Sequence, residues 1–506
     1  MPDDHPPPSP DHDSRDAIRL VLAFLAVRCA AAWFCPATID EAYGIVVSRA
    51  WSLSYFDHPP ACFTLARVVA WLTGSESVFL ARVPFLLAGT AAAWLVYDVT
   101  RIAYGPVAGL WALAWHSVAP FFLVSAGHFV VPDGPLDLAL LLTLRLVLPD
   151  LLAPDRAPHL GRWCAAGAAF AVAFASKYQA VLFGASALAV LVASPPHRRL
   201  LRSPAVWAAL AISAVGLLPT LLWNQAHGWI SLGFQAGRAG AGSLSLQPVN
   251  FLLVLGGQML YVLPGTWLVT LVAGFRGVTR PRTPADRVFG WFAILPPVVF
   301  LAIALVSRRS LPHWAMSGFL FGFPLVGEWT ARALERHRRA IELTWRWTAA
   351  AVVIAFLGYS MQARHAAFTR AVPALAATCD LDWQHQDWPA LADARAALGA
   401  PDVIVTSNWT TAAKAAHALG PTVAVVPASD PRHFQFLPRP ALDHVAFAVA
   451  PADPGAADRV REDFTSLLGQ LGWRVVGTPR VIDQRTGGQL RFHLVAIPVR
   501  PADANR

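Results

Sequence analysis

The stretch DEAYGIVVSRAWSLSYFDHPP, residues 40–60, follows an apolar run that is long enough to cross a membrane. This run, residues 17–35, lacks the small-residue cleavage site of a signal peptide, so we expect it to be a retained first span. Three acids and a histidine lie beyond it: Asp40, Glu41, Asp57 and His58. Ionisable groups at membrane depth are costly, so their gathering where a span ends indicates a functional site.

The composition of the chain is that of a polytopic membrane protein. Its 506 residues are 56% hydrophobic and only 14% charged, whereas a soluble domain carries about 25% charged residues. The formal net charge of +9 comes from arginines that cluster in short loops between apolar runs. Because this distribution is typical of topology determinants, it argues against a nucleic-acid partner.

Eleven apolar runs are candidate spans of a bilayer, which needs roughly 20 residues per helix. They are residues 17–35, 79–98, 106–124, 135–149, 163–176, 178–194, 205–223, 251–274, 288–306, 314–330 and 347–361. The predicted fold class is therefore a polytopic α-helical membrane protein. Its transmembrane catalytic domain covers 17–361, after a disordered cytoplasmic leader at 1–16 that is rich in Pro, Asp and His.

The composition becomes that of a soluble domain after the last span. Short β-rich runs such as PDVIVTS (401–407) and PTVAVVP (421–427) alternate with helical patterns at 409–419 and 456–471. This alternation predicts a small α/β domain over residues 362–506.

The arginine distribution also predicts the orientation of the chain. With the N-terminus inside, the inner loops hold most of the arginines and the outer loops are sparser. The positive-inside rule then places the first loop, residues 36–78, outside the cytoplasm, and eleven spans place the C-terminal domain there too. We therefore expect a multi-pass protein of the bacterial inner membrane, with its active site on the extracytoplasmic side.

Several further polar residues fall on that same face. They are Asp133, Lys177, Asn224, His227 and His313. Several of the polar residues have a structural alternative: Asp57 can cap a helix before its prolines, Asp133 can open a turn, Lys177 can extend to the interface, and the histidines can pack there. The adjacent acids Asp40 and Glu41 are harder to explain by topology alone.

Transfer of a sugar from a polyprenyl phosphate suits this set of residues. The leaving phosphate is already ionised and needs only stabilisation by a cation or a metal ion. The acceptor hydroxyl needs one general base, whereas glycoside hydrolysis needs two flanking carboxylates. Two other interpretations stay open: a transporter or flippase of a lipid-linked sugar, whose site would lie at mid-membrane, and a structural subunit.

Blocks along nearly the whole chain resemble one family in their order. After DEAY…YFDHPP come SESVFLARVP (75–84), PDGPL (132–136), ASKYQAVLF (175–183), LLWNQAHGWISLGFQ (221–235) and DPRHFQFLP (430–438). This series resembles the bacterial integral-membrane glycosyltransferases of the GT-C fold. That group contains the protein O-mannosyltransferases of glycosyltransferase family 39 and the aminoarabinose transferase of lipid A.

The resemblance implies roles for individual residues. It makes Asp40 the catalytic base and Glu41 its partner. Some relatives have Glu-Lys before the two prolines, where the acid helps to hold a metal and the lysine meets phosphate. Here the pair is Asp57-His58, so a divalent metal ion held by Asp57 is the one cofactor to consider, and His58 departs from the pattern.

The remaining roles concern the two substrates. Arg82 and Lys177, with His58, are the predicted contacts of the donor phosphate. Asp133, Asn224, His227 and His313 are predicted to line the site with Asp57. The expected partners are the lipid bilayer, a polyprenyl-phosphate sugar, and a lipid, polysaccharide or protein acceptor.

Overall fold

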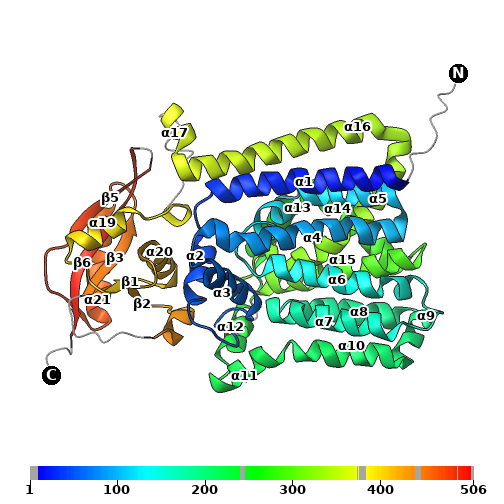
Figure 1. Cartoon of the computed structure of the whole chain (residues 1–506), viewed down its shortest axis with the longest axis horizontal. Coiled ribbons are helices and arrows are strands. Elements are labelled where there is room, and N and C mark those ends of the chain that lie inside the picture. The colour runs from blue at the N-terminus through cyan, green and yellow to red at the C-terminus, as the bar shows by residue number, and fades with distance from the viewer. Residues whose placement is uncertain are drawn as a thin grey trace. The chain divides into compact units, whose positions relative to one another are not determined.

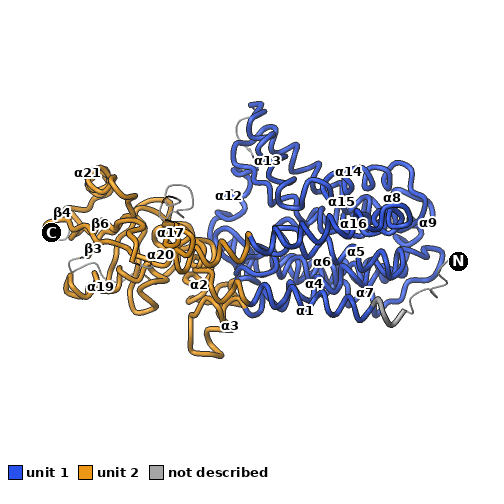
Figure 2. The backbone as a smooth tube through the Cα atoms, turned by 90° about the horizontal axis from the view of Figure 1, so that it is seen from above, with its two compact units in different colours: residues 1–29, 53–62, 83–354 blue, residues 30–52, 63–82, 355–506 orange. Residues whose placement is uncertain are grey.

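The computed structural model describes residues 10–239, 245–372, 374, 383–438, 446–486 and 488–502. Most of its elements are helices, and a six-stranded sheet lies toward the C-terminus of the chain (Figure 1). The chain forms two compact units, each assembled from segments that are distant in sequence (Figure 2). Unit 1 comprises residues 1–29, 53–62 and 83–354, and unit 2 comprises residues 30–52, 63–82 and 355–506.

Unit 1 is helical, and helices α1, α4 and α16 continue from it into unit 2. Its elements are α1 (Pro10–Phe34), α4 (Val78–Tyr104), α5 (Pro106–Val118), the π-helical η1 (Phe121–Ser125), α6 (Asp133–Leu152), α7 (Leu160–Ser176), α8 (Ala180–Ala193), α9 (Pro195–Arg198), η2 (Arg199–Arg202), α10 (Pro204–Val215), α11 (Leu218–Ala226), α12 (Ile230–Arg238), α13 (Pro248–Val262), α14 (Pro264–Thr279), α15 (Pro284–Val306), η3 (Pro312–Ala315) and α16 (Met316–His365). Proline opens α5, α10, α13, α14 and α15, where its missing N–H leaves no helical hydrogen bond unmade.

Tight packing joins these helices. The rings of Phe183, Phe292 and Phe321 contact one another with centroids 4.6 to 5.5 Å apart. Helices α14 and α15 approach so closely that a Cβ at Gly277 would lie 2.2 Å from the carbonyl oxygen of Asp286. Such contacts give this part of the unit an interior of closely packed side chains.

The helices account for the predicted spans, but the count of eleven is not confirmed. Within the described residues, five helices are long and apolar enough to cross a membrane, or up to seven if each of two bent pairs is one span. The predicted run 251–274 is two helices, α13 and α14, bent by 104° at Leu263, whose φ is +70°. The runs 314–330 and 347–361 lie on opposite sides of His337, where the backbone is not helical and α16 divides into two helices, so they remain two separate helical segments.

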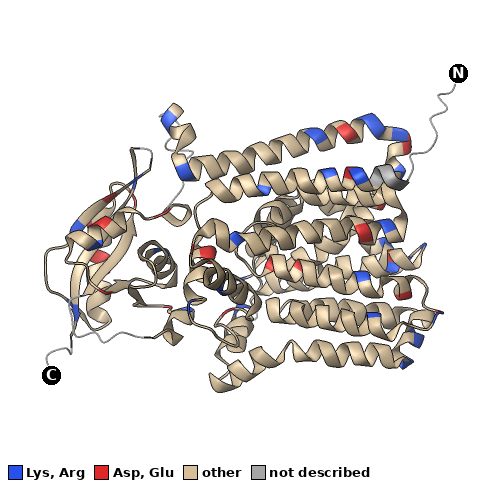
Figure 3. Ribbon diagram, in the orientation of Figure 1, with Lys and Arg blue, Asp and Glu red and all other residues tan. Residues whose placement is uncertain are grey.

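Charged residues are sparse along the middle of the unit 1 helices. Basic side chains gather at the end of unit 1 where α9 lies (Figure 3). This is the distribution on which the predicted orientation depends. The predicted leader falls partly outside the described residues, at 1–9, and α1 begins within it at Pro10.

Unit 2 combines parts of the first loop with the C-terminal domain. Its elements are α2 (Ile39–Val47), most of α3 (Ala61–Thr73), α17 (Ala367–Ala371), η5 (Trp383–His385), α19 (Ala390–Ala397), β1 (Val403–Thr406), α20 (Trp409–Leu419), β2 (Ala424–Pro427), η6 (Arg432–Phe436), β3 (Ala446–Ala452), α21 (Ala457–Gln470), β4 (Trp473–Val475), β5 (Arg480–Thr486) and β6 (Gln489–Pro501).

The sheet has the order β2-β1-β3-β6-β4, and β5 also pairs with β6. Strands β1, β2 and β3 are parallel, and β6 is antiparallel to β3, β4 and β5. Alternate residues of β3 face opposite sides: Ala448 packs toward Phe464 of α21, and Phe447 packs with Ala415 of α20. The result is a sheet covered by helices on both faces, which confirms the predicted α/β domain.

Candidate functional site

The start of helix α2 holds the adjacent acids Asp40 and Glu41. Thr38 is the N-cap, and its hydroxyl accepts a hydrogen bond from the backbone N–H of Glu41 at 3.3 Å. The Glu41 carboxylate in turn accepts from the backbone N–H of Thr38 at 3.0 Å, which completes a capping box. This local sequence therefore fixes the first turn of α2, on which Asp40 is exposed while Glu41 is fully buried.

Glu41 is paired with Arg82, which is also fully buried. The guanidinium donates two hydrogen bonds to the carboxylate, from Nε to Oε1 and from Nη2 to Oε2, each at 2.7 Å. Its other N–H groups donate to the carbonyl oxygens of Ala32, Cys35 and Pro36 at 2.7 to 2.9 Å. Arg82 thus ties the end of α1 to the start of α2.

The structure gives Arg82 a different role from the predicted one. A guanidinium has five N–H donors, and the five hydrogen bonds to Glu41 and the three carbonyls use all of them. None is left for a lipid phosphate in this arrangement. The phosphate role of Arg82 therefore stays a prediction that this arrangement does not favour. The sequence does not show that Arg82 and Glu41, far apart along the chain, meet in the interior.

A second group of predicted residues lies in unit 1. The Lys177 ammonium donates to the Asp133 carboxylate at 2.8 Å, and both side chains are largely buried. Lys177 occupies the break between α7 and α8, and Asp133 is the first residue of α6. The ASKYQ interruption and the PDGPL turn therefore position one ion pair.

Other polar groups surround this pair. The imidazole of His313, on η3, lies close enough to Lys177 and Asp133 for their charges to act on it. Sequence reasoning missed two further residues there. Asp137 is buried one helical turn beyond Asp133, a spacing that could have signalled a shared face. Arg238, at the end of α12, places its guanidinium 4.9 Å from the ring centroid of Trp314, next to His313.

Helix α12 also holds the segment that contains Asp57 and His58. Gln235 donates to the backbone carbonyl of Asp57 at 2.6 Å, and the rings of Phe56 and Phe234 lie 4.9 Å apart. Asp57 is buried and His58 is half-buried. Within unit 1 these contacts bring residues 53–62 to the same helix that carries Arg238.

Asn224 and His227 are held by hydrogen bonds to the backbone. The Asn224 amide donates to the carbonyl of Thr220 and accepts from the N–H of Leu232, so it joins α11 to α12. The His227 ring bonds the carbonyl of Trp223 through Nδ1 and stacks on its indole at 4.1 Å. These contacts favour the packing alternative for His227 and give Asn224 a structural role between the two helices.

The predicted metal role of Asp57 can be compared with the grouping of possible ligand side chains. Within the described ranges, no three His, Cys, Asp or Glu side chains are grouped so that they could hold a metal ion. Catalytic zinc sites use three protein ligands, whereas Mg²⁺ is bound by one or two carboxylates together with substrate phosphates. A divalent metal ion at Asp57 therefore stays a prediction.

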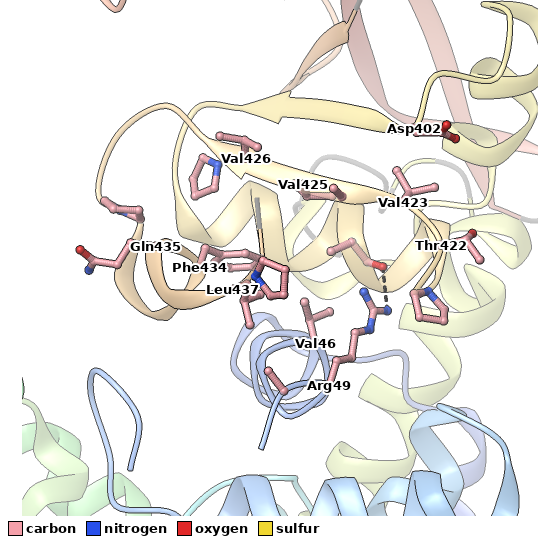
Figure 4. Close-up of a pocket in the computed structure, with 17 residues that line it drawn as sticks. Val46, Arg49, Asp402, Thr422, Val423, Val425, Val426, Phe434, Gln435 and Leu437 are labelled. Atoms are coloured by element: carbon pink, nitrogen blue, oxygen red, sulfur yellow. Dashed lines mark hydrogen bonds between the residues drawn. The ribbon is translucent and has the colours of Figure 1, made fainter. Parts of the chain in front are cut away.

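A pocket of about 470 Å³ opens in unit 2 beside strand β2 (Figure 4). Most of its lining residues are apolar, with valine, proline and alanine prominent, and Arg49, Asp402, Thr422 and Gln435 are its polar members. The predicted site residues are not among those that line it. We therefore place the candidate chemistry at the two polar groups above rather than in this pocket.

Comparisons with known proteins agree with the predicted resemblance. Residues 57–223 match the family model of the dolichyl-phosphate-mannose-protein mannosyltransferases. The lipid A galacturonosyltransferase RgtD of Rhizobium johnstonii is 24% identical over 288 residues, which are 56% of this chain and 58% of that protein's length.

Solved structures show the same fold. ArnT from Cupriavidus metallidurans, crystallised with undecaprenyl phosphate, matches with a TM-score of 0.57 at 18% identity, over 95% of this chain and 97% of that one. The oligosaccharyltransferase of Archaeoglobus fulgidus, tethered to an acceptor peptide, matches with a TM-score of 0.50 at 10% identity, over 83% of this chain and 64% of that one. The predicted resemblance to the GT-C glycosyltransferases and the predicted helical membrane fold class are confirmed.

Proposed function

The chain has the GT-C fold of the integral-membrane glycosyltransferases, and from this premise we propose that it moves a sugar from a polyprenyl phosphate to an acceptor hydroxyl outside the cytoplasm. Asp40 is the general base of this reaction. The relative crystallised with undecaprenyl phosphate supports the donor class, and the relative named for lipid A supports a glycolipid acceptor.

The difference in burial between Asp40 and Glu41 supports the proposed role of Asp40 as the general base. Two acids stand side by side at the start of α2, but the carboxylate of Glu41 is fully buried and bonded to Arg82 and Thr38. Asp40 is exposed on the same turn. A general base must reach the proton that it removes, so Asp40 is suited to the role and Glu41 is a positioning residue.

The proposed reaction is a single displacement. The Asp40 carboxylate takes the proton of the acceptor hydroxyl, and the hydroxyl oxygen forms a bond to the anomeric carbon of the sugar. The bond from that carbon to the phosphate oxygen breaks, and its electron pair leaves with the lipid phosphate. The phosphate leaves as an anion and needs no protonation, so cations suffice to stabilise it.

Cations of unit 1 are proposed to receive that phosphate. Lys177 supplies a buried ammonium whose pairing with Asp133 leaves further N–H donors on the same nitrogen. Arg238 supplies a planar guanidinium beside His313, which suits bidentate contact with phosphate oxygens. His58 stays a third candidate, and no step is assigned to a metal ion.

The test is transfer of a labelled sugar from a polyprenyl phosphate to a lipid A acceptor by purified protein. Removing a positioned general base costs about 10²–10⁴-fold in rate, so Asp40→Asn should fold, bind the donor and transfer almost nothing. Asp453→Asn makes the same change at another exposed acid and should retain wild-type turnover. Near-normal transfer by Asp40→Asn would remove Asp40 from the mechanism and favour a lipid-linked sugar transporter.

A further inference from the structure

Helix α20 of the C-terminal domain packs against helix α2, which carries Asp40, within unit 2. The Tyr43 ring of α2 contacts Trp409 at 5.3 Å and Phe434 at 6.0 Å between centroids. The Tyr43 hydroxyl accepts a hydrogen bond from the backbone N–H of His433 at 3.2 Å. The apolar contacts give α2 and the C-terminal domain a common interior.

Two basic side chains cross this contact in opposite directions. The Lys414 ammonium, on α20, donates to the backbone carbonyl of Ala37 at 2.8 Å. The Arg49 guanidinium, just beyond α2, donates to the carbonyl of Ala416 at 3.1 Å (Figure 4). Arg49 is itself held by two hydrogen bonds through Nε and one through Nη2 to Glu76. One end of α2 is therefore fixed by Lys414 and the other by Arg49.

The position of Ala37 makes the Lys414 contact important. Ala37 precedes Thr38, the N-cap of α2, and Asp40 lies in the first turn that this cap begins. The Ala37 carbonyl is outside the helix, so no helical hydrogen bond holds it. Lys414 supplies that restraint from the C-terminal domain.

Burial of the Lys414 ammonium is energetically unfavourable. Lys414 is only 3% exposed, and burial lowers the pKa of its ammonium from 10.5 to about 8. Asp387, Glu41, Cys35 and Arg82 are the charged or titratable groups that face it, and the first three favour its charged form. His417, one turn along α20, has a pKa lowered to about 4 by burial and then by Lys414, with Asp387, Arg49 and Glu76 nearby, so it is neutral at pH 7.

The sign of this shift matters for stability. Because the pKa of Lys414 is lower in the folded chain, its burial opposes folding below pH 8, and that opposition fades as pH rises toward 10.5. An ordinary structural hydrogen bond would not need an ammonium. Of the chain's 40 basic residues, only Lys177 and Lys414 are lysines.

We propose that Lys414 is a positioning residue for sugar transfer, which holds the Ala37 carbonyl and thereby fixes the turn of α2 that presents Asp40. The C-terminal domain then contributes to catalysis by positioning Asp40. This inference rests on the proposed role of Asp40 as the general base.

The first measurement is transfer by Lys414→Met, which keeps the length of the side chain but removes the donor. A small misplacement of a reacting group can cost about 10²-fold in rate. We expect kcat to fall about 10- to 100-fold, with the donor KM within about twofold of wild type. Lys414→Gln, whose amide can donate one hydrogen bond, should recover part of the loss. Arg459→Met removes an exposed charge of the same domain and should leave kcat unchanged.

Three further readouts separate positioning from folding. At pH 7 the melting temperature of Lys414→Met should not fall, because the variant loses a buried charge. Amide exchange in residues 39–47 should accelerate, since the start of α2 loses its restraint. The wild-type rate should decline as pH rises through about 8, where Lys414 loses its proton, and Lys414→Gln should lack this decline.

The outcomes distinguish this inference from the proposed function. Full activity of Lys414→Met with normal amide exchange would overturn the positioning role while leaving Asp40 as the base. A lowered melting temperature with a matching loss of donor binding would also overturn it, because the lysine would then serve the fold. By contrast, wild-type protein that transfers no sugar, or Asp40→Asn that transfers normally, would overturn the proposed function itself.

Discussion

At the scale of single residues, two adjacent acids differ in burial, and for this reason we propose different roles for them. Arg82 and Glu41 form a fully buried pair, and breaking such a pair by removing one partner costs about 3–5 kcal/mol. We therefore expect Arg82→Met to lower the melting temperature strongly, whereas the donor KM of the protein that remains folded stays near wild type.

The double variant Arg82→Met with Glu41→Gln is the matched control for this prediction. It removes both charges, and Gln can still close the capping box with Thr38. Its melting temperature should lie above that of Arg82→Met. A large rise in donor KM with unchanged stability in Arg82→Met would restore the phosphate role that the sequence suggested.

Lys177 is predicted to act on the donor. A hydrogen bond to a charged group contributes about 1.5–3 kcal/mol, so Lys177→Met should weaken donor binding about 10- to 100-fold. It should also destabilise the fold, because the buried Asp133 carboxylate loses its partner. Lys177→Met combined with Asp133→Asn should regain stability but not donor affinity, which titration with undecaprenyl phosphate would measure. Wild-type affinity in the double variant would place the phosphate elsewhere.

The sequence identified Asp40, Lys177 and Asp133 as polar residues at span ends, because such residues are conspicuous in an apolar chain. It could not show which of them meet. The pairing of Glu41 with Arg82 and the contact of Lys414 with Ala37 depend on tertiary packing across long separations. Local sequence patterns do not indicate such long-range contacts. For this reason Arg82 was predicted to contact the donor phosphate, and no role was predicted for Lys414.

At the scale of elements, neighbouring glycines in α13 offer a direct test of helix packing. A Cβ at Gly257 would lie 2.4 Å from the ring of Pro312, at the start of the η3 segment that carries His313, whereas a Cβ at Gly256 would meet nothing within 4 Å. Overpacking costs about 1–3 kcal/mol, so Gly257→Ala should lower the melting temperature in detergent.

Gly256→Ala is the control for the preceding variant. In a helix, replacing Gly by Ala gains up to about 1 kcal/mol, so this variant should melt at or slightly above the wild-type temperature. Equal melting temperatures of the two variants would mean that α13 does not pack closely on η3. The helix positions followed from apolar runs. The bend at Leu263 is marked in the sequence by Pro264 and Gly265, which follow it directly, but the prediction of one run over 251–274 did not use this signal.

At the scale of the whole molecule, the arginine asymmetry predicts the topology. Reporter insertions after Gly74, in the first loop, should be extracytoplasmic, and insertions after Arg156, between α6 and α7, should be cytoplasmic; both positions are exposed. Paired alkaline phosphatase and fluorescent protein fusions would measure this. A cytoplasmic signal at Gly74 would place Asp40 on the side opposite to the proposed acceptor.

The fold class was predictable at this scale because composition and alternating patterns report membrane helices and α/β domains well. The composition of unit 2 was not predictable, because residues 30–52 and 63–82 join a unit whose main part begins at residue 355. Prediction from consecutive segments of the sequence assigns the first loop to the membrane helices. Only the packing of α2 against α20 reveals the other grouping.

The bond between Lys414 and Ala37 also sets an order of events during biosynthesis. The two residues are 377 positions apart, so the ribosome has completed most of the chain before Lys414 exists. The helix that precedes Ala37 is made early, yet the turn with Asp40 gains its restraint only when the last domain has been synthesised and has folded. A polypeptide that terminates early would sit in the bilayer as an unfinished and inactive precursor, unable to consume lipid-linked sugar.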